Sequence, residues 1–360
     1  MHTGIRSYGI ALPKYRIDSA EIWGVWKNLS KSFFDLLSIG ERGVCAPEED
    51  TITLAVSAAK MALERATISN ESIGAVFLGS GTSPYATKAA ATILIDALDL
   101  PKSALTCDVQ CSDKSGSTAL WMAAGLIEAG LIENALVIGA DTLNRHTQPG
   151  MVLEYVASAG AVAFVLGKEN LIATLEGFAT HSHDQNDYFR TEGERFIQAG
   201  AGFYGWVANW GLLDHVVPAG TELFEKTGLK PEDFSKFAVP QKTGLRPLMT
   251  MGKLELDMMQ VLPFVLTSQI GDCGAAGVLL SLAHILDFAE SGERIGVIDY
   301  GCGAGSDAWS LVCTDLLPER RPTRDLVVEC LEDKIMVDYA TMIKFEGKLM
   351  QSPHRLSNYY

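Results

Sequence analysis

The stretch Asp108-Val-Gln-Cys-Ser-Asp-Lys-Ser-Gly-Ser-Thr-Ala-Leu120 joins an apolar segment to a helical run that continues to about Leu131. A cysteine at the start of such a helix is a good acyl acceptor, because the free N–H groups and the positive helix end stabilise a thiolate. Here Cys111 comes early, and Asp113 stands directly before Lys114. A carboxylate caps a helix well but cannot form a thioester. The stretch therefore has the form of a nucleophile elbow whose nucleophile has been replaced.

Further segments of the chain resemble one known family. They are Leu78-Gly-Ser-Gly-Thr-Ser-Pro-Tyr-Ala-Thr-Lys88, Val137-Ile-Gly-Ala-Asp-Thr142, Tyr188-Phe-Arg-Thr-Glu-Gly193 and Tyr300-Gly-Cys-Gly-Ala-Gly-Ser-Asp-Ala308. Their order and spacing are similar to those of hydroxymethylglutaryl-CoA synthases, from Ile5 to about Asp315. The resemblance implies an α/β protein with the thiolase fold, a duplicated layered α-β-α-β-α architecture like that of ketoacyl synthase III.

A finer likeness concerns the synthase-like subunit of the bacterial diacetylphloroglucinol acyltransferase. It includes the segments Trp26-Lys-Asn28, Glu49-Asp-Thr-Ile-Thr-Leu54, Gly139-Ala-Asp-Thr-Leu-Asn-Arg145 and Lys334-Ile-Met-Val-Asp-Tyr339. In that complex a separate thiolase-like subunit carries the reactive cysteine, and a small zinc-ribbon/OB-fold protein bridges the larger subunits. The likeness implies both partners here, together with self-association as a dimer.

Four positions that carry chemistry in the synthases hold other residues in this chain. The resemblance places the general acid/base glutamate on Gly81 and the acyl-accepting cysteine on Asp113. It places the substrate-polarising histidine on Pro240 and an asparagine of a glycine-rich turn on Asp272. We therefore expect no catalytic residue at these positions, and Cys111 is the fallback nucleophile. If the fold brings Asp113 and Asp272 together, they would hold a cation or polar group between them.

These losses predict a non-catalytic structural and specificity subunit of a multi-subunit thiolase-type acyltransferase, a pseudoenzyme working in a hetero-oligomer. The complex would use a CoA thioester, and this chain would bind no cofactor tightly. The alternative is an active condensing acyltransferase that uses Cys111 as a displaced nucleophile. The missing residues argue against an ordinary hydroxymethylglutaryl-CoA synthase. Neither the acyl group nor the direction of the reaction follows from the residues.

Composition and charge exclude several kinds of partner and binding site. The chain has 360 residues, 48% of them hydrophobic and 20% charged, enough for two subdomains around a large core. Its net charge of −15 argues against nucleic acid or an anionic membrane as partner. Seven scattered cysteines without a CxxC pair indicate reduced thiols, and His181-Ser-His183 lacks further ligands at metal-binding spacing. We expect a cytoplasmic protein, with no metal site and no targeting or spanning segment.

Hydrophobic periodicity predicts alternating strands and helices, including a strand over 4–11, a helix over 51–66 capped by Thr51, and strands over 134–138 and 161–166. The last two, with the loop between them, have a counterpart in the strands predicted over 294–300 and 308–314. This internal repeat predicts two thiolase-like halves, 1–167 and 168–317.

Two segments depart from this alternation of strands and helices. The aromatic-rich insertion near 180–215 contains Phe196, Phe203-Tyr-Gly-Trp206 and Trp210. In the family this region caps the substrate tunnel, but a packed subdomain or interface is preferred here, because a tunnel to Asp113 would serve no nucleophile. The C-terminal extension, 318–360, is charged and then mixed basic and apolar. Its likeness to the acyltransferase subunit predicts a docking role.

Overall fold

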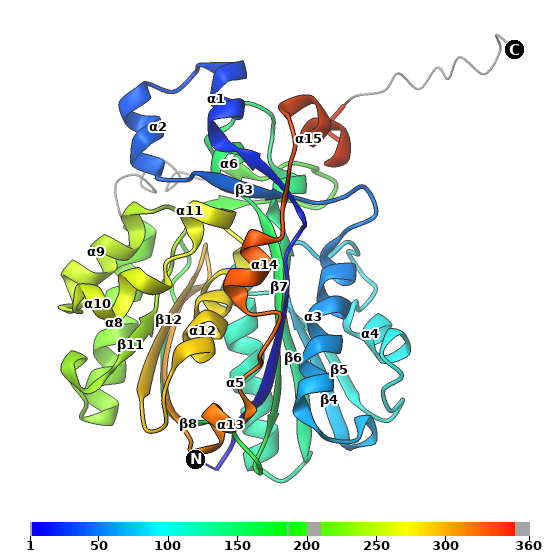
Figure 1. Cartoon of the computed structure of the whole chain (residues 1–360), viewed down its shortest axis with the longest axis vertical. Helices are drawn as coiled ribbons and strands as arrows, with labels where there is room; N and C mark the ends of the chain where they lie inside the picture. Colours follow the sequence, from blue (N-terminus) through cyan, green and yellow to red (C-terminus); the bar gives the residue numbers. More distant parts are fainter. Residues whose placement is uncertain (1, 186, 200–209, 350–360) are drawn as a thin grey trace, which may run out of the picture.

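A nine-stranded sheet forms the centre of the computed structural model, which describes residues 2–185, 187–199 and 210–349 (Figure 1). Across the sheet the strands are β11 (Lys236–Ala238), β12 (Arg294–Gly301), β13 (Gly305–Cys313), β8 (Ala173–His181), β1 (Gly4–Ala11), β7 (Ala159–Gly167), β6 (Asn134–Thr142), β4 (Ile73–Gly79) and β5 (Leu105–Val109). The first four come from the later part of the chain and the other five from the earlier part.

The two sets of strands repeat one pattern. β6 runs parallel to β4 and antiparallel to β7, and β12 likewise runs parallel to β11 and antiparallel to β13. The sets join where β1 pairs with β8, at Gly4↔Thr174 and Ile5↔Ala173. The strand–loop–strand repeat expected from the sequence is therefore present, and the duplicated α/β fold class is confirmed. The boundaries at 167 and 317 stay predictions.

Helices fill the layers around this sheet. α5 (Ser115–Glu128) packs on β4 and β6, and α12 (Gly277–Phe288) packs on β11, β12 and β7, so both lie between the two sets of strands (Figure 1). α3 (Thr51–Ala66) covers one outer face and α8 (Trp210–Thr227) the other. The remaining helices are α1 (Ser19–Trp26), α2 (Lys31–Leu37), α4 (Ala91–Ala97), α6 (Val152–Val156), α9 (Leu245–Leu254), α10 (Met258–Val261), α11 (Thr267–Ile270), α13 (Leu316–Arg320), α14 (Val327–Glu332) and α15 (Tyr339–Phe345).

Local sequence signals locate α3 and most strands of the large sheet, but they misplace the cap of α3 and miss strand β8. The strand over 4–11 and the helix over 51–66 have the predicted bounds. The cap of α3 is Asp50, not Thr51: its carboxylate accepts the Thr53 N–H at 2.8 Å, since a carboxylate one residue earlier meets the free N–H groups first. Strand β8 was not predicted, because its outward residues mix polar and apolar types and hide the alternation.

The described part of the tail packs on its own chain. β14 (Ile335–Met336) extends a small sheet with β2 (Tyr15–Asp18) and β3 (Glu41–Val44). After α15, the fully buried Glu346 carboxylate binds Arg42 at 2.7 Å and Lys348 at 2.7 Å. Breaking a buried ion pair of this kind is costly, because it leaves an uncompensated charge in the interior. The tail up to Leu349 is thus an integral part of the fold.

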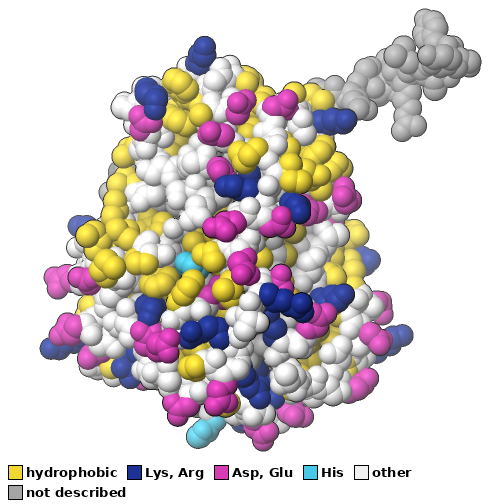
Figure 2. Space-filling view, viewed as in Figure 1, with side chains coloured by type: hydrophobic (Ala, Val, Ile, Leu, Met, Phe, Trp, Pro, Cys, Tyr) yellow, Lys and Arg dark blue, Asp and Glu magenta, His cyan; other side chains and the backbone are white. Residues whose placement is uncertain are grey.

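The surface mixes charge signs. Acidic and basic side chains are interspersed over the face in Figure 2, and an apolar area lies over α9 and α10, where Leu248, Met258 and Met259 are exposed. The seven cysteines are all described and form no disulfide. Within the described ranges, no helix combines the length and apolar character needed to cross a membrane.

Candidate active site

The turn before α5 presents Cys111 and Asp113 at the start of the central helix. The backbone N–H of Cys111 donates to the Ser115 hydroxyl at 2.7 Å, which ties the turn to the first residue of the helix. Ser112, between the two, has φ +54°, a left-handed conformation that non-glycine residues adopt at a cost. This strained turn brings two chemically different residues, a cysteine and an aspartate, into the lining of one cavity.

The cavity in front of this turn encloses about 840 Å³, including space open to solvent. It is lined by Gly81, Thr82, Gln110, Cys111, Ser112, Asp113, Leu143, Tyr188, Phe189, Arg190, Ile197, Cys302, Gly303 and Ala304. Cavities of this size are typical of small-molecule sites. The segment 188–197 therefore forms a wall of the cavity. The expectation of a packed subdomain or interface for the insertion stays a prediction; β9 (Tyr188–Phe189) lies against the turn, where the Tyr188 hydroxyl donates to Asp113. The aromatic run 203–206 lies outside the described residues.

A buried ionic cluster closes the inner end of the cavity. The Lys242 ammonium donates to Asp113 Oδ2, to Asp272 Oδ2 at 3.1 Å and to the Tyr188 hydroxyl at 3.2 Å. Burial alone would lower the pKa of Lys242, but the carboxylates of Asp113 and Asp272 raise it well above its usual value. The expected cation between these carboxylates is thus the side chain of Lys242.

Asp272 reaches this cluster through an unusual backbone. Gly271 has φ +83°, and a Cβ there would lie 2.6 Å from the Val156 carbonyl oxygen, so only glycine fits. The next residue exchanges backbone hydrogen bonds of 2.7 Å with Val156 and Ser158. Burial raises the pKa of Asp272 while Lys242 opposes that rise. The carboxylate is therefore held rigidly against the ammonium.

The other two matched positions supply no acid or base. The Gly81 N–H donates to the buried Asp141 at 2.9 Å, and that carboxylate also accepts from Ser80, Thr82 and Ala275. Burial raises the pKa of Asp141 to about 6. Its hydrogen bonds fix the loop 80–82 in place. Pro240 is buried and has no ionisable group. Acid/base chemistry in the cavity must therefore come from other side chains.

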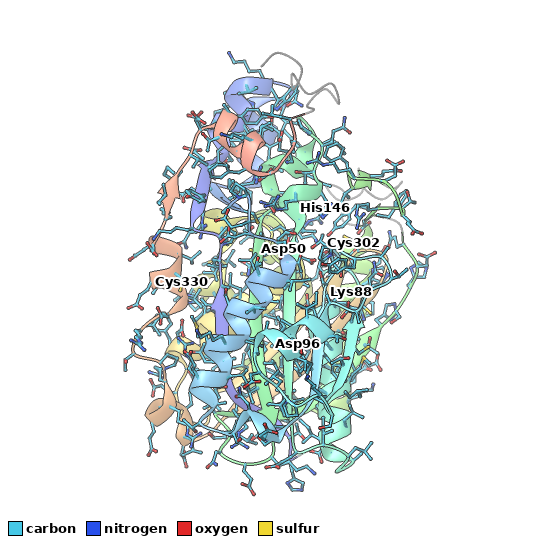
Figure 3. All side chains as sticks on the ribbon, turned by 90° about the vertical axis from the view of Figure 1, so that its right-hand side faces the viewer. Asp50, Lys88, Asp96, His146, Cys302 and Cys330 are labelled. Atoms are coloured by element: carbon cyan, nitrogen blue, oxygen red, sulfur yellow. The ribbon has the colours of Figure 1, made fainter. Side chains whose placement is uncertain are left out.

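Two thiols line the cavity, and they differ in environment. Cys111 is partly exposed, whereas Cys302 is 6% exposed, and burial raises the pKa of its thiol well above the usual value. Cys302 thus stays protonated and unreactive. In Figure 3 it lies on the side of the molecule opposite Cys330. The backbone beside it is close to the turn: a Cβ on Gly301 would lie 2.3 Å from the Cys111 carbonyl oxygen.

The H-x-H pair lies beside a third histidine. His181 ends strand β8, and its ring and that of His183 lie 5.9 and 5.5 Å from the ring of His215. Over the ranges that the structure describes, no group of three or more His, Cys, Asp or Glu side chains has a metal-binding arrangement.

Comparison with known proteins agrees with this architecture. The family model for 3-oxoacyl-[acyl-carrier-protein] synthase III matches residues 107–183. Hydroxymethylglutaryl-CoA synthase from Pyrobaculum neutrophilum is 39% identical over 342 residues, 95% of this chain and 96% of that protein. The synthase from Methanobrevibacter smithii is 38% identical over 346 residues, 96% of this chain and 99% of that protein.

The chain belongs to the hydroxymethylglutaryl-CoA synthase family.

Solved structures extend the likeness of fold. A complex of MvaS with 3-hydroxy-3-methylglutaryl coenzyme A superimposes with a TM-score of 0.86 at 22% identity, covering 97% of this chain and 92% of that one. A hydroxymethylglutaryl-CoA synthase complexed with CoA gives 0.84 at 19% identity, covering 98% and 92%.

Family membership corrects the expectation of a non-catalytic subunit. Relatives of 36–39% identity over nearly the whole chain are named as synthases, which are condensing enzymes. That expectation was based on the residues replaced at four positions, because the sequence alone does not show which side chains surround them. The structure has an open cavity with a partly exposed thiol and a charged cluster where an emptied site was expected.

Sequence reasoning did not single out Lys242, Tyr188 or Cys302 as site residues. Lys242 stands four residues after the end of β11. A lysine this close to a buried strand was the one feature of the sequence that could have indicated it as a site residue. Tyr188 and Cys302 stand in segments quoted for the family resemblance, but neither type is diagnostic there. Their roles depend on contacts between residues 54 to 129 positions apart.

Proposed function

We propose that the chain is a condensing acyltransferase that takes an acyl group from a CoA thioester onto the thiol of Cys111. The observation that carries the proposal is the position of this residue: partly exposed, in the turn that leads into the central helix, and in the lining of a substrate-sized cavity.

The reaction would proceed in two steps. The Cys111 sulfur attacks the thioester carbonyl, the bond from that carbon to the CoA sulfur breaks, and CoA leaves with the proton that the thiol gave up. A carbon nucleophile, formed by loss of a proton from the acceptor carbon, then attacks the acyl-enzyme; the C–C bond forms as the carbon–sulfur bond breaks, and the departing thiolate takes up that proton and becomes the thiol again. Each step uses only the thiol, a CoA thioester and an acceptor.

The family supports a CoA thioester as the donor. Its members named above are hydroxymethylglutaryl-CoA synthases, and two structural neighbours were solved with 3-hydroxy-3-methylglutaryl-CoA or CoA bound. At the cavity wall, Arg190 is exposed and is suited to meet an anionic substrate group.

The finer likeness to the diacetylphloroglucinol acyltransferase subunit supports a further proposal about assembly. The chain would associate with a thiolase-like subunit and a small zinc-ribbon/OB-fold protein, and with a second copy of itself. Co-expression followed by co-purification and mass measurement of the complex tests this assembly separately from the chemistry.

The chemistry is tested by peptide mapping after incubation with acetyl-CoA. We expect an acetyl group on Cys111 that is lost in Cys111→Ser and retained in Cys302→Ser, the matched control from the same cavity. An adduct that maps to Cys302, or no adduct on the purified chain or its complex, would overturn the assignment of Cys111.

A further inference from the structure

Condensation in which a thioester methyl group becomes the carbon nucleophile needs a group that removes a proton from that carbon. The positions where the family carries its glutamate and histidine hold Gly81 and Pro240, which have no titratable group. If the proposed function holds, the proton must pass to another side chain that reaches the cavity.

Tyr188 is the side chain with this geometry. It lines the cavity together with Cys111, and it is 9% exposed. Its hydroxyl donates to Asp113 Oδ1 at 2.5 Å, a short hydrogen bond to a carboxylate. The phenol and the buried carboxylate that accepts its hydrogen bond thus both line the cavity.

Lys242 prepares this pair for proton transfer. Its ammonium donates to the Tyr188 hydroxyl at 3.2 Å and to Asp113 Oδ2, and it lies 5.0 Å from the centre of the tyrosine ring. Positive charge beside the phenolic oxygen stabilises negative charge that develops there. Burial, followed by the neighbouring Asp113, raises the pKa of Tyr188 well above its usual value, so the resting group is a neutral phenol.

We infer that Tyr188 is the catalytic acid/base of this condensing enzyme, relaying the substrate proton to Asp113, with Lys242 as a positioning residue. This inference rests on the proposed function and deepens it. Asp113 then has a catalytic task at the position where the family carries its nucleophile.

The relay conserves protons and charge. As the C–H bond of the thioester methyl group breaks, its proton moves to Tyr188 Oη, and the proton already on Oη moves to Asp113 Oδ1. The electron pair of the broken bond remains on the substrate as an enolate and forms the new C–C bond. As that bond forms, the carbon–sulfur bond of the acyl-enzyme breaks, and the departing Cys111 thiolate takes the proton back by the reverse path, which restores the thiol and the Asp113 carboxylate.

Deuterium exchange tests the relay without requiring a known acceptor. The chain is incubated with acetyl-CoA in D₂O, and deuterium is measured in the methyl group of both free acetyl-CoA and the acetylated Cys111 peptide. We expect uptake by the wild type, and uptake slower by about 100-fold or more in Tyr188→Phe and Asp113→Asn. Acetylation of Cys111 should persist in Tyr188→Phe.

Tyr8→Phe is the matched control. Tyr8 is also buried, and its hydroxyl donates to Asp287 at 2.6 Å, away from the cavity. It loses the same kind of hydrogen bond, so a purely structural effect would be equal in both variants. We expect deuterium uptake by Tyr8→Phe to equal that of the wild type.

The outcomes separate this inference from the proposed function. Acetylation with equal deuterium uptake in wild type and Tyr188→Phe, or with none in either, would overturn the relay and leave Cys111 as acyl acceptor. Tyr188-dependent uptake into free acetyl-CoA without an adduct would support the relay and overturn Cys111. Absence of both adduct and uptake in the wild type would overturn both.

Discussion

Replacing Lys242 with methionine, a side chain of similar length without charge, would leave two buried carboxylates facing each other. The side chains of Lys242, Asp113 and Asp272 are 5%, 6% and 9% exposed. The attraction across the 3.1 Å contact to Asp272 is about 5 kcal/mol at an effective dielectric constant of about 20. Desolvation offsets much of it, and removing one partner of a buried pair typically costs about 3–5 kcal/mol.

This cost converts into a measurable melting shift. With about 2.1 cal/mol/K per residue, unfolding 360 residues has an entropy of about 0.76 kcal/mol/K, so each kcal/mol lowers Tm by about 1.3 °C. Lys242→Met should therefore melt about 4–7 °C below the wild type at pH 8 in differential scanning calorimetry. Lys31→Met is the control, since Lys31 pairs with Asp35 on the surface, and its Tm should not change measurably.

The shift should also depend on pH. Without the ammonium, the native variant would bind a proton on one buried carboxylate that the unfolded chain, with its Asp pKa near 3.9, does not bind. Since the native state then binds more protons, the deficit relative to wild type should shrink as the pH falls from 8 toward 5. A deficit no larger than that of Lys31→Met, or one independent of pH, would refute the reasoning. Adding Asp113→Asn and Asp272→Asn should restore most of the lost stability.

Three further results are expected. Burial raises the pKa of Asp299 to about 8, so between about pH 4 and pH 8 the native state binds more protons than the unfolded state and stability falls as the pH rises; Asp299→Asn should flatten that fall in denaturation curves. Glu346→Gln should cost about 3–5 kcal/mol, because it leaves the Arg42 guanidinium buried without its carboxylate, and should speed proteolysis of the tail; unchanged cleavage would contradict this. Gly301→Ala would place a Cβ 2.3 Å from the Cys111 carbonyl oxygen, and we expect slower acetylation of that thiol by peptide mapping.

Much of the fold follows from local patterns. Regular apolar spacing predicts α3 and the matching strand pairs of the two halves, since each element carries its own buried face. Strand β8 lacks a clean alternation and was found only in the structure, where pairing with β1 and β13 gives it its form. Element boundaries marked by a cap depend on which of two adjacent polar residues faces the helix, as with Asp50 and Thr51.

The residues of the site likewise fall into those that the sequence indicated and those that only the structure revealed. Gly81, Asp113, Pro240 and Asp272 could be identified as altered positions because each stands in a recognisable segment. Lys242 and Tyr188, which bond to Asp113 in the cluster, could not be identified from the sequence. The sequence does not specify which distant side chain lies beside an altered position. Two buried aspartates, Asp113 and Asp272, are stable side by side only with a cation between them. In the fold this cation is Lys242, which is 129 residues from Asp113 in the sequence.

The sequence by itself determined the family, the duplicated α/β architecture and the presence of a thiol and a carboxylate in the turn before the central helix. These depend on local periodicity and on motifs whose order is read directly along the chain. Only the tertiary structure decided that the altered positions surround a charged cluster with Tyr188 at its face, and that the insertion lines a cavity with Cys111. Such contacts join segments far apart in sequence, and their chemistry arises from burial and distance, which no local pattern contains.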